Sequence, residues 1–116
     1  MQVQAITKNI NMSAQKMREV VRQIQGLPAL QAQATLAVVP RKGARVVAKT
    51  LQSALANAED QARQGKAQNV EPGKLRVREA VAQTAHTLKR FTPKARGSAG
   101  PILKRSCHIK IVLSDQ

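Results

Sequence analysis

Residues 88–109, LKRFTPKARGSAGPILKRSCHI, are the stretch that decides the fold of this chain. They contain six basic residues and no acidic residue. The centre of the stretch, residues 92–101, is rich in Pro, Gly and Ser, which favour turns. A segment on each side alternates between apolar residues and others in the manner of a β-strand. The pattern predicts a long, extended β-hairpin over about residues 85–109.

The charges of the hairpin predict a polyanionic partner. If the turn is placed near Gly97, Lys89 and Arg90 lie roughly opposite Arg105 and Lys104. Like charges that face each other across two strands repel, and a hairpin without a hydrophobic face is marginal in water. About ten residues per strand, at ~3.3 Å each, give the arm a reach of ~30 Å. Such an arm needs an anion between or around its charges.

The whole chain has the composition of a nucleic-acid-binding protein. Its 116 residues predict a single domain, 1–116, with a core of modest size. Twenty basic and six acidic residues give a net charge of +14, which indicates binding to nucleic acid or an anionic membrane. Phe91 is the only aromatic residue, so the chain lacks the several aromatic residues on which base-stacking modules are built. We therefore expect contacts to phosphate and sugar.

Residues suited to catalysis or to metal binding are scarce. Cys107 and His108 are neighbours in a predicted strand, so their side chains point to opposite faces. One Cys and two His are too few for a zinc site, and the sequence has no phosphate-binding loop or dinucleotide motif. We expect that the protein is not an enzyme and that it binds no metal and no cofactor.

The remaining segments predict a small body. Residues 2–10 read as a strand in which Val3, Ala5 and Thr7 alternate. Ser13 is the expected N-cap of a first helix, and Gly26 is the expected residue that ends it in a left-handed conformation.

Two prolines predict the starts of two further helices. Pro28 and Pro40 each suit the first position of a helix. The third helix runs from about Arg41 to Arg63 with apolar residues at three- and four-residue spacing, and Gly65 is expected to close it. Residues 64–74 form a polar loop.

These elements predict an α+β fold. We expect a small antiparallel three-stranded sheet packed on three helices, with the long extended β-hairpin projecting from it. The body is expected over about residues 1–84 and 110–116. The expected inward-facing residues of the hairpin strands are Leu75, Val77, Val81, Ile109, Ile111 and Leu113.

Four blocks of the sequence resemble a known family. They are MSAQKMREVVRQIQG at 12–26, AKTLQSALANAE at 48–59, KLRV at 74–77, and the hairpin from residue 88 onward. Together they span most of the chain, and it resembles the bacterial large-subunit ribosomal protein numbered twenty-two, a protein of the polypeptide exit tunnel. The pairing of SALANAE with PKARG and ILKRSCHI carries most of this resemblance.

The resemblance implies a function and a set of sites. The body would lie on the outside of the large ribosomal subunit, and the hairpin would follow the tunnel wall through large-subunit ribosomal RNA. Further implied partners are neighbouring ribosomal proteins and the nascent polypeptide, and an implied role is support of subunit assembly. The tip that lines the tunnel would be Lys94, Ala95, Arg96, Gly97 and Ser98. The expected RNA-binding residues are Lys16, Arg18, Arg22, Arg41, Lys42, Arg45, Lys49, Lys89, Arg90, Lys94, Arg96, Lys104, Arg105 and His108.

Two departures from the family pattern concern the tip and a loop. Ser98 and Pro101 stand where many members carry a basic residue, so the tip is less charged. The loop at 64–74 is longer than in some members.

Other interpretations remain open at this point. The row Arg41, Arg45 and Lys49 suits a solvated helix surface as well as phosphate contact. An architectural DNA-binding protein is the alternative function, with Phe91 or Pro93 as an apolar wedge at the hairpin tip.

A membrane location is disfavoured. A membrane-surface helix fits poorly because the apolar stripes are needed for a core. No apolar run approaches the ~20 residues of a membrane span, and a secretory signal is not expected. We expect the cytoplasm, in the ribosome, with an organellar ribosome left open.

Overall fold

A computed structural model describes residues 2–64 and 74–115. The elements in chain order are β1 (Gln2–Ile10), α1 (Ala14–Val21), α2 (Ala29–Val38), α3 (Lys42–Arg63), β2 (Arg76–Thr84), β3 (Leu88–Pro93), a 3-10 turn (Ala95–Gly97), β4 (Ala99–Lys104) and β5 (Cys107–Ser114).

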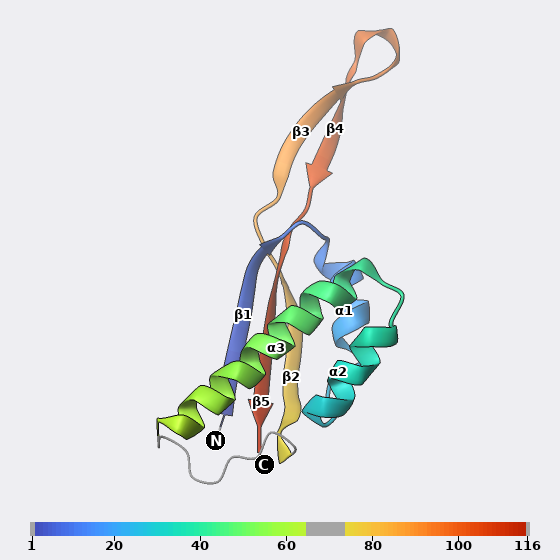
Figure 1. Ribbon diagram of the computed structural model, residues 1–116. Coiled ribbons are helices and arrows are strands. Elements are labelled where there is room, and N and C mark those ends of the chain that lie inside the picture. The colour runs from blue at the N-terminus through green and yellow to red at the C-terminus, as the bar shows by residue number, and fades with distance from the viewer. Residues whose placement is uncertain (1, 65–73, 116) are drawn as a thin grey trace.

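The body is one antiparallel sheet covered on one face by helices. The strand order is β1–β5–β2, and α1, α2 and α3 lie on the same side of the sheet (Figure 1). The middle strand, β5, packs Ile109, Ile111 and Leu113 into the core, where they are fully buried. The predicted α+β fold is thereby confirmed, whereas the alternation expected along β5 holds only as far as Ile111, because Val112 and Ser114 are buried as well.

The first strand also follows its predicted pattern. Val3 and Ala5 are buried against the helices. Thr7 meets α3, where its hydroxyl lies 2.7 Å from that of Thr50, which is itself buried. A polar group in a core must find a hydrogen-bond partner. The Thr50 hydroxyl finds two, because it also donates to the Val46 carbonyl at 3.0 Å.

The first helix begins as predicted but ends earlier. The Ser13 hydroxyl accepts a hydrogen bond from the Lys16 backbone N–H at 3.4 Å, whereas the helix stops at Val21 and not just before Gly26. The chain between them forms turns. Gly26 does have a positive φ of 80°, and its N–H donates to the Val77 carbonyl at 2.8 Å. The hydrogen bond between Gly26 and β2 therefore replaces a continuation of the helix.

Neither proline occupies the predicted first helical position. Pro28 is the N-cap of α2 and has an extended ψ of 143°, because this segment bridges to Arg76 of β2. Pro40 lies one residue before Arg41, the extended N-cap of α3. Gly65 and residues 65–73 of the predicted loop lie outside the described residues.

Strand β2, which leads into the hairpin, changes face at a bulge. Leu75 and Val77 are buried as predicted, but Val81 is only half-buried and Ala80 and Ala82 enter the core instead. The register against β5 shifts between Val77 and Glu79. One extra residue inverts the alternation beyond it, so the prediction for Val81 was wrong.

The helices approach one another closely because small residues line their contacts. A Cβ on Gly43 would lie 2.8 Å from the Met17 sulfur, and Met17 is fully buried. Alanines at 44, 54 and 58 continue the buried face of α3. Close approach of the helices thus fills the core, which contains no aromatic side chain.

The β3–β4 ribbon continues away from the body as an arm (Figure 1). The molecule measures 67 × 27 × 17 Å, and its radius of gyration is 17.6 Å. A compact domain of this length would have a radius of gyration of about 13 Å. The predicted long hairpin is therefore confirmed.

Core and arm should respond differently to truncation. Leu51 of α3 is fully buried, whereas Leu103 of β4 is 47% exposed. We expect Leu51→Ala to lower the free energy of unfolding by about 2–5 kcal/mol, and Leu103→Ala to change it by no more than about 0.5 kcal/mol. Urea unfolding of both variants measures this. Equal losses would contradict the assignment of the core to the body.

Candidate nucleic-acid interface

The pairing of the arm differs from the predicted register. Leu88 pairs with Lys104, Lys89 with Leu103, and Arg90 with Ile102. The three basic residues in the shaft, the paired part of the arm formed by β3 and β4, therefore each face an apolar residue, and Arg105 lies beyond the end of β4. The prediction that Lys89 and Arg90 face Arg105 and Lys104 was wrong.

The cause lies in the turn. It is centred on Arg96 and not on Gly97, and both residues have left-handed φ, 61° and 74°. Only Gly adopts such a φ freely, so the sequence gives no sign that Arg96 takes it. When the centre of a hairpin moves by one residue, the partner of every residue on the opposite strand changes by two positions.

The tip is a tight loop that exposes its side chains. The Lys94 N–H donates to the Ser98 carbonyl at 2.6 Å, and the Ser98 N–H donates to the Ala95 carbonyl at 3.4 Å. Residues 94–98 are all exposed. Phe91 and Pro93 belong to β3, so neither stands at the tip, where a wedge was considered.

Opposed residues of an antiparallel pair project to the same side, which gives the arm two different faces. The mixed face consists of Leu88, Arg90, Thr92, Gly100, Ile102 and Lys104. The apolar face consists of Lys89, Phe91, Pro93, Ala99, Pro101 and Leu103. The cations of the shaft are therefore unevenly divided between its two sides.

The arm meets the body at an elbow where predicted residues from distant segments converge. Three residues, 85–87, oppose two, 105–106, between the paired strands. The Ala85 N–H donates to the Ser106 carbonyl at 3.1 Å. Lys16 and Arg18 of α1 line the same hollow as Arg105. The fold thus brings three cations to the base of the arm.

A second group of cations surrounds the start of α3. Arg41, Lys42 and Arg45 are exposed and line one hollow beside α2. The N-terminus of a helix is electropositive, so cations there are unfavourable, and α3 has no acidic residue in its first turn. Arg41 lies 3.5 Å from Glu19, with both side chains more than half exposed, which contributes little to stability. This end of α3 therefore favours an external anion.

Besides Arg41, three of the predicted residues use their side chains in hydrogen bonds within the protein, and one of them is Arg90, whose Nη1 donates to the Lys89 carbonyl at 3.0 Å. Arg18 Nε donates to the Ala82 carbonyl at 3.2 Å, which ties α1 to β2. Asn9 donates its N–H to Nδ1 of the half-buried His108 at 3.1 Å. Arg22 and Lys49 are exposed and have no such bond among the described residues.

The prediction missed cations on the face of the sheet that carries no helices. Lys110 is half-buried on the middle strand, between Ile6 and Val81. Lys8 is exposed on β1. A strand side chain that alternates with buried neighbours points away from the core, so the alternation around Ile109 and Ile111 could have placed Lys110 there.

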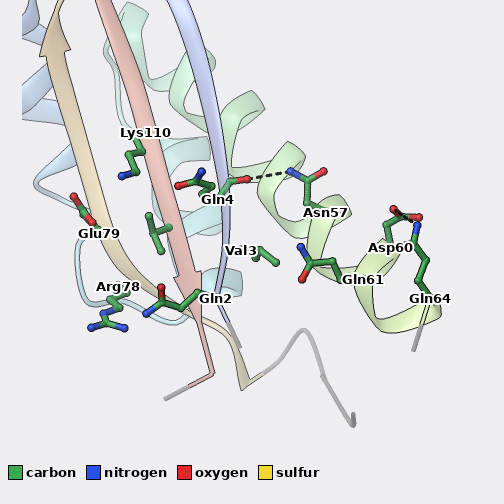
Figure 2. Close-up of a pocket in the computed structure, with 11 residues that line it drawn as sticks. Gln2, Val3, Gln4, Asn57, Asp60, Gln61, Gln64, Arg78, Glu79 and Lys110 are labelled. Carbon is green, nitrogen blue, oxygen red and sulfur yellow. Dashed lines mark hydrogen bonds between the residues drawn. The ribbon is translucent and has the colours of Figure 1, made fainter. Parts of the chain in front are cut away.

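An open hollow at the end of the body far from the arm is lined by five amide side chains and by four charged residues, Asp60, Arg78, Glu79 and Lys110 (Figure 2). Asn57 donates to the Gln4 carbonyl at 3.1 Å, and Gln64 donates to Asp60 at 3.1 Å. These groups bond to one another, so this hollow offers no convergent set of side chains for chemistry.

The described residues also hold no cluster of metal-binding side chains and no activated nucleophile. No group of three or more His, Cys, Asp or Glu residues gathers among them. Burial raises the pKa of the Cys107 thiol, which keeps it protonated at neutral pH. In the described part of the chain, no helix has the length and apolar character needed to cross a bilayer.

Comparison with known proteins gives one family. The family model for ribosomal protein L22p/L17e matches residues 5–114. The chain is 47% identical over 115 residues to the large ribosomal subunit protein uL22 of Opitutus terrae, covering 99% of this chain and 96% of that protein. It is 43% identical to uL22 of Akkermansia muciniphila, covering 100% and 98% of the two chains. It is 41% identical to uL22 of Methylacidiphilum infernorum, covering 100% and 96%.

The arm should be mobile in the free protein. Its strands pair only with each other, and nearly all their residues are exposed, so little burial opposes local opening. We expect amides of residues 88–104 to exchange hydrogen much faster than those of β5. Hydrogen-exchange mass spectrometry without RNA measures this, and protection equal to that of β5 would contradict it.

Proposed function

This chain belongs to the ribosomal protein L22p/L17e family, and from that membership we propose that it binds large-subunit ribosomal RNA and lines the polypeptide exit tunnel with its arm. The family consists of structural proteins of the ribosome and not of enzymes. The large subunit of the cytoplasmic ribosome is the location that follows from this membership.

One observation carries the RNA-binding part of the proposal. All six cations of residues 88–105 are exposed, and no carboxylate pairs with any of them among the described residues. Repulsion between such charges opposes the compact arrangement of the arm. Phosphate groups relieve this cost, and each one bound releases counterions.

The proposed binding surface extends from the arm over the helical side of the body. Arg90 and Lys104 of the mixed face, the three cations of the elbow and the start of α3 are its centres. Arg22 and Lys49 are its outlying members on that side, and His108 would add a contact from the face of the sheet that carries no helices. Such a surface would hold several RNA segments together, which supports assembly of the subunit.

The proposed tunnel-lining part is residues 94–98. The arm sets this loop at one extreme of a molecule 67 Å long, far from the core that fixes the body. With the shaft in RNA, Arg96 at the apex would lie beside the nascent polypeptide. Neighbouring ribosomal proteins would meet the body.

Sedimentation tests whether the protein is part of the large ribosomal subunit. The tagged full-length protein should migrate with the large subunit in a sucrose gradient, and ribonuclease treatment should release it. Migration with chromosomal DNA, in a manner resistant to ribonuclease, would support the architectural alternative and contradict ours.

The affinity for ribosomal RNA should fall steeply with salt. If six or more cations contact phosphate, we expect the plot of log affinity against log salt concentration to have a slope of about −4 or steeper. Filter binding at several potassium chloride concentrations measures it. A nearly flat response would mean that the exposed cations do not bind phosphate.

Deletion of Leu88, Lys89 and Arg90 should move the tip while the body stays bound. Losing an odd number of residues from one strand inverts the faces of everything between the gap and the turn. We expect such ribosomes to assemble and to respond differently to macrolides or stalling peptides, as read by toeprinting.

A triple alanine variant at the same three positions is the matched control. It removes the same side chains but keeps the register, so it should weaken RNA binding without moving the tip. If the deletion is incorporated and responses are unchanged, the tunnel-lining role is wrong, although RNA binding is unaffected by that result.

A further inference from the structure

The apolar face of the arm has no partner within the protein. Phe91 is 75% exposed and Leu103 47% exposed, and Pro93, Ala99 and Pro101 beside them are also exposed. Lys89 at the base is the one cation of this face. Leaving an aromatic ring in water forfeits the gain from burying it, so such a face indicates a contact surface.

Another β-strand cannot readily add to this arm. Proline has no N–H to donate across a ladder, so Phe91↔Pro101 and Pro93↔Ala99 are pairs of the non-hydrogen-bonded kind. Both prolines therefore interrupt the outer edges of their strands, one on β3 and one on β4. Prolines at such edges block the addition of a further strand.

The surrounding charge selects the partner. Residues 88–105 contain six cations and no acidic residue, so a second copy of this chain would bring like charges together. A suitable partner carries negative charge and also presents flat apolar surfaces. Single-stranded nucleic acid has both, because unpaired bases expose their faces beside the phosphates.

Phe91 and Pro101 form the most suitable contact for a base. They are direct partners across the two strands, and side chains of non-hydrogen-bonded pairs lie close together. The ring and the proline therefore stand side by side on one surface, with Lys89 two residues away along β3 and Arg90 on the opposite face.

We propose that the apolar face binds unpaired RNA bases, with at least one base stacked on Phe91 beside Pro101, while Arg90 and Lys104 of the mixed face bind phosphate. This inference rests on the proposed RNA-binding function and names the part of the RNA that the arm reads. Phe91, the only aromatic residue of the chain, would thus stack on a base by itself, without further aromatic residues beside it.

Binding of the full-length protein to three probes tests the inference. The probes are a twelve-nucleotide unpaired RNA of mixed sequence, the same length of abasic strand, and a duplex RNA. Removing a stacking aromatic costs about 1–3 kcal/mol, so Phe91→Ala should weaken binding to the unpaired RNA about 5- to 150-fold. Its binding to the abasic strand and the duplex should stay within about twofold, as expected for contacts to phosphate.

Ile102→Ala is the matched control. Ile102 is an exposed apolar residue of the same ribbon but lies on the mixed face, and its truncation should change none of the three affinities more than about twofold. A second readout is Phe91→Trp, which gives the chain its only tryptophan. Its fluorescence should be quenched by the unpaired RNA and not by the abasic strand.

Two results would overturn the inference. An equal loss on unpaired and abasic strands would show that Phe91 acts only through the shape of the arm. No loss on the unpaired RNA would show that no base stacks there.

Vesicles of phosphatidylserine provide a third check. Binding to them that depends on Phe91, together with unchanged RNA binding, would assign the apolar face to membranes. If Phe91→Ala has no effect while the protein still sediments with the large subunit, the inference is wrong and the proposed function stands. If the wild-type protein does not sediment with that subunit, the proposed function itself is wrong.

Discussion

The pairing of β5 with both β1 and β2 is the interaction on which the rest of the structure depends. β5 lies in the middle of the sheet, and its inward residues Ile109, Ile111 and Leu113 form the floor on which the helices pack. Two strands of this sheet, β2 and β5, also connect to the arm (Figure 1). Packing in the core therefore fixes the direction in which the arm projects from the body. The base of the arm is held in place in this way, although the arm itself has almost no buried residues.

Much of the chain's charge is placed at a cost to the free protein. Cations occupy the electropositive start of α3, converge at the elbow, and line a two-stranded arm without carboxylates. Each arrangement is unfavourable alone, because like charges repel and helix N-termini favour anions. The helical body compensates through a continuous core that extends from Val3 to Leu113. This division lets the body fold before the arm has found its partner.

The two sides of the arm differ in chemistry because side chains alternate along its strands. With Arg96 at the apex, Arg90 and Lys104 share one side while Phe91, Pro101 and Leu103 share the other. Had the turn been centred one residue later, the predicted pairing would have opposed cations directly and joined other residues across the ribbon. The backbone conformation at Arg96 therefore decides which residues of β3 and β4 pair directly, while each face keeps the same side chains.

The sequence alone determined the fold class, the existence of the hairpin and its excess of positive charge. These follow from local periodicity and composition, as in the alternation of Ile109, Ile111 and Leu113 or the stripe along α3. Tertiary structure decided the early end of α1, the bulge after Val77 that buries Ala80 and Ala82, the hollow that Lys16 and Arg105 both line, and the arm's register. Each of these depends on backbone hydrogen bonds or contacts to residues far away in the chain, or on a left-handed φ at a residue that ordinarily avoids it. No pattern of neighbouring residues encodes such choices, because competing arrangements differ only in which distant groups satisfy one another.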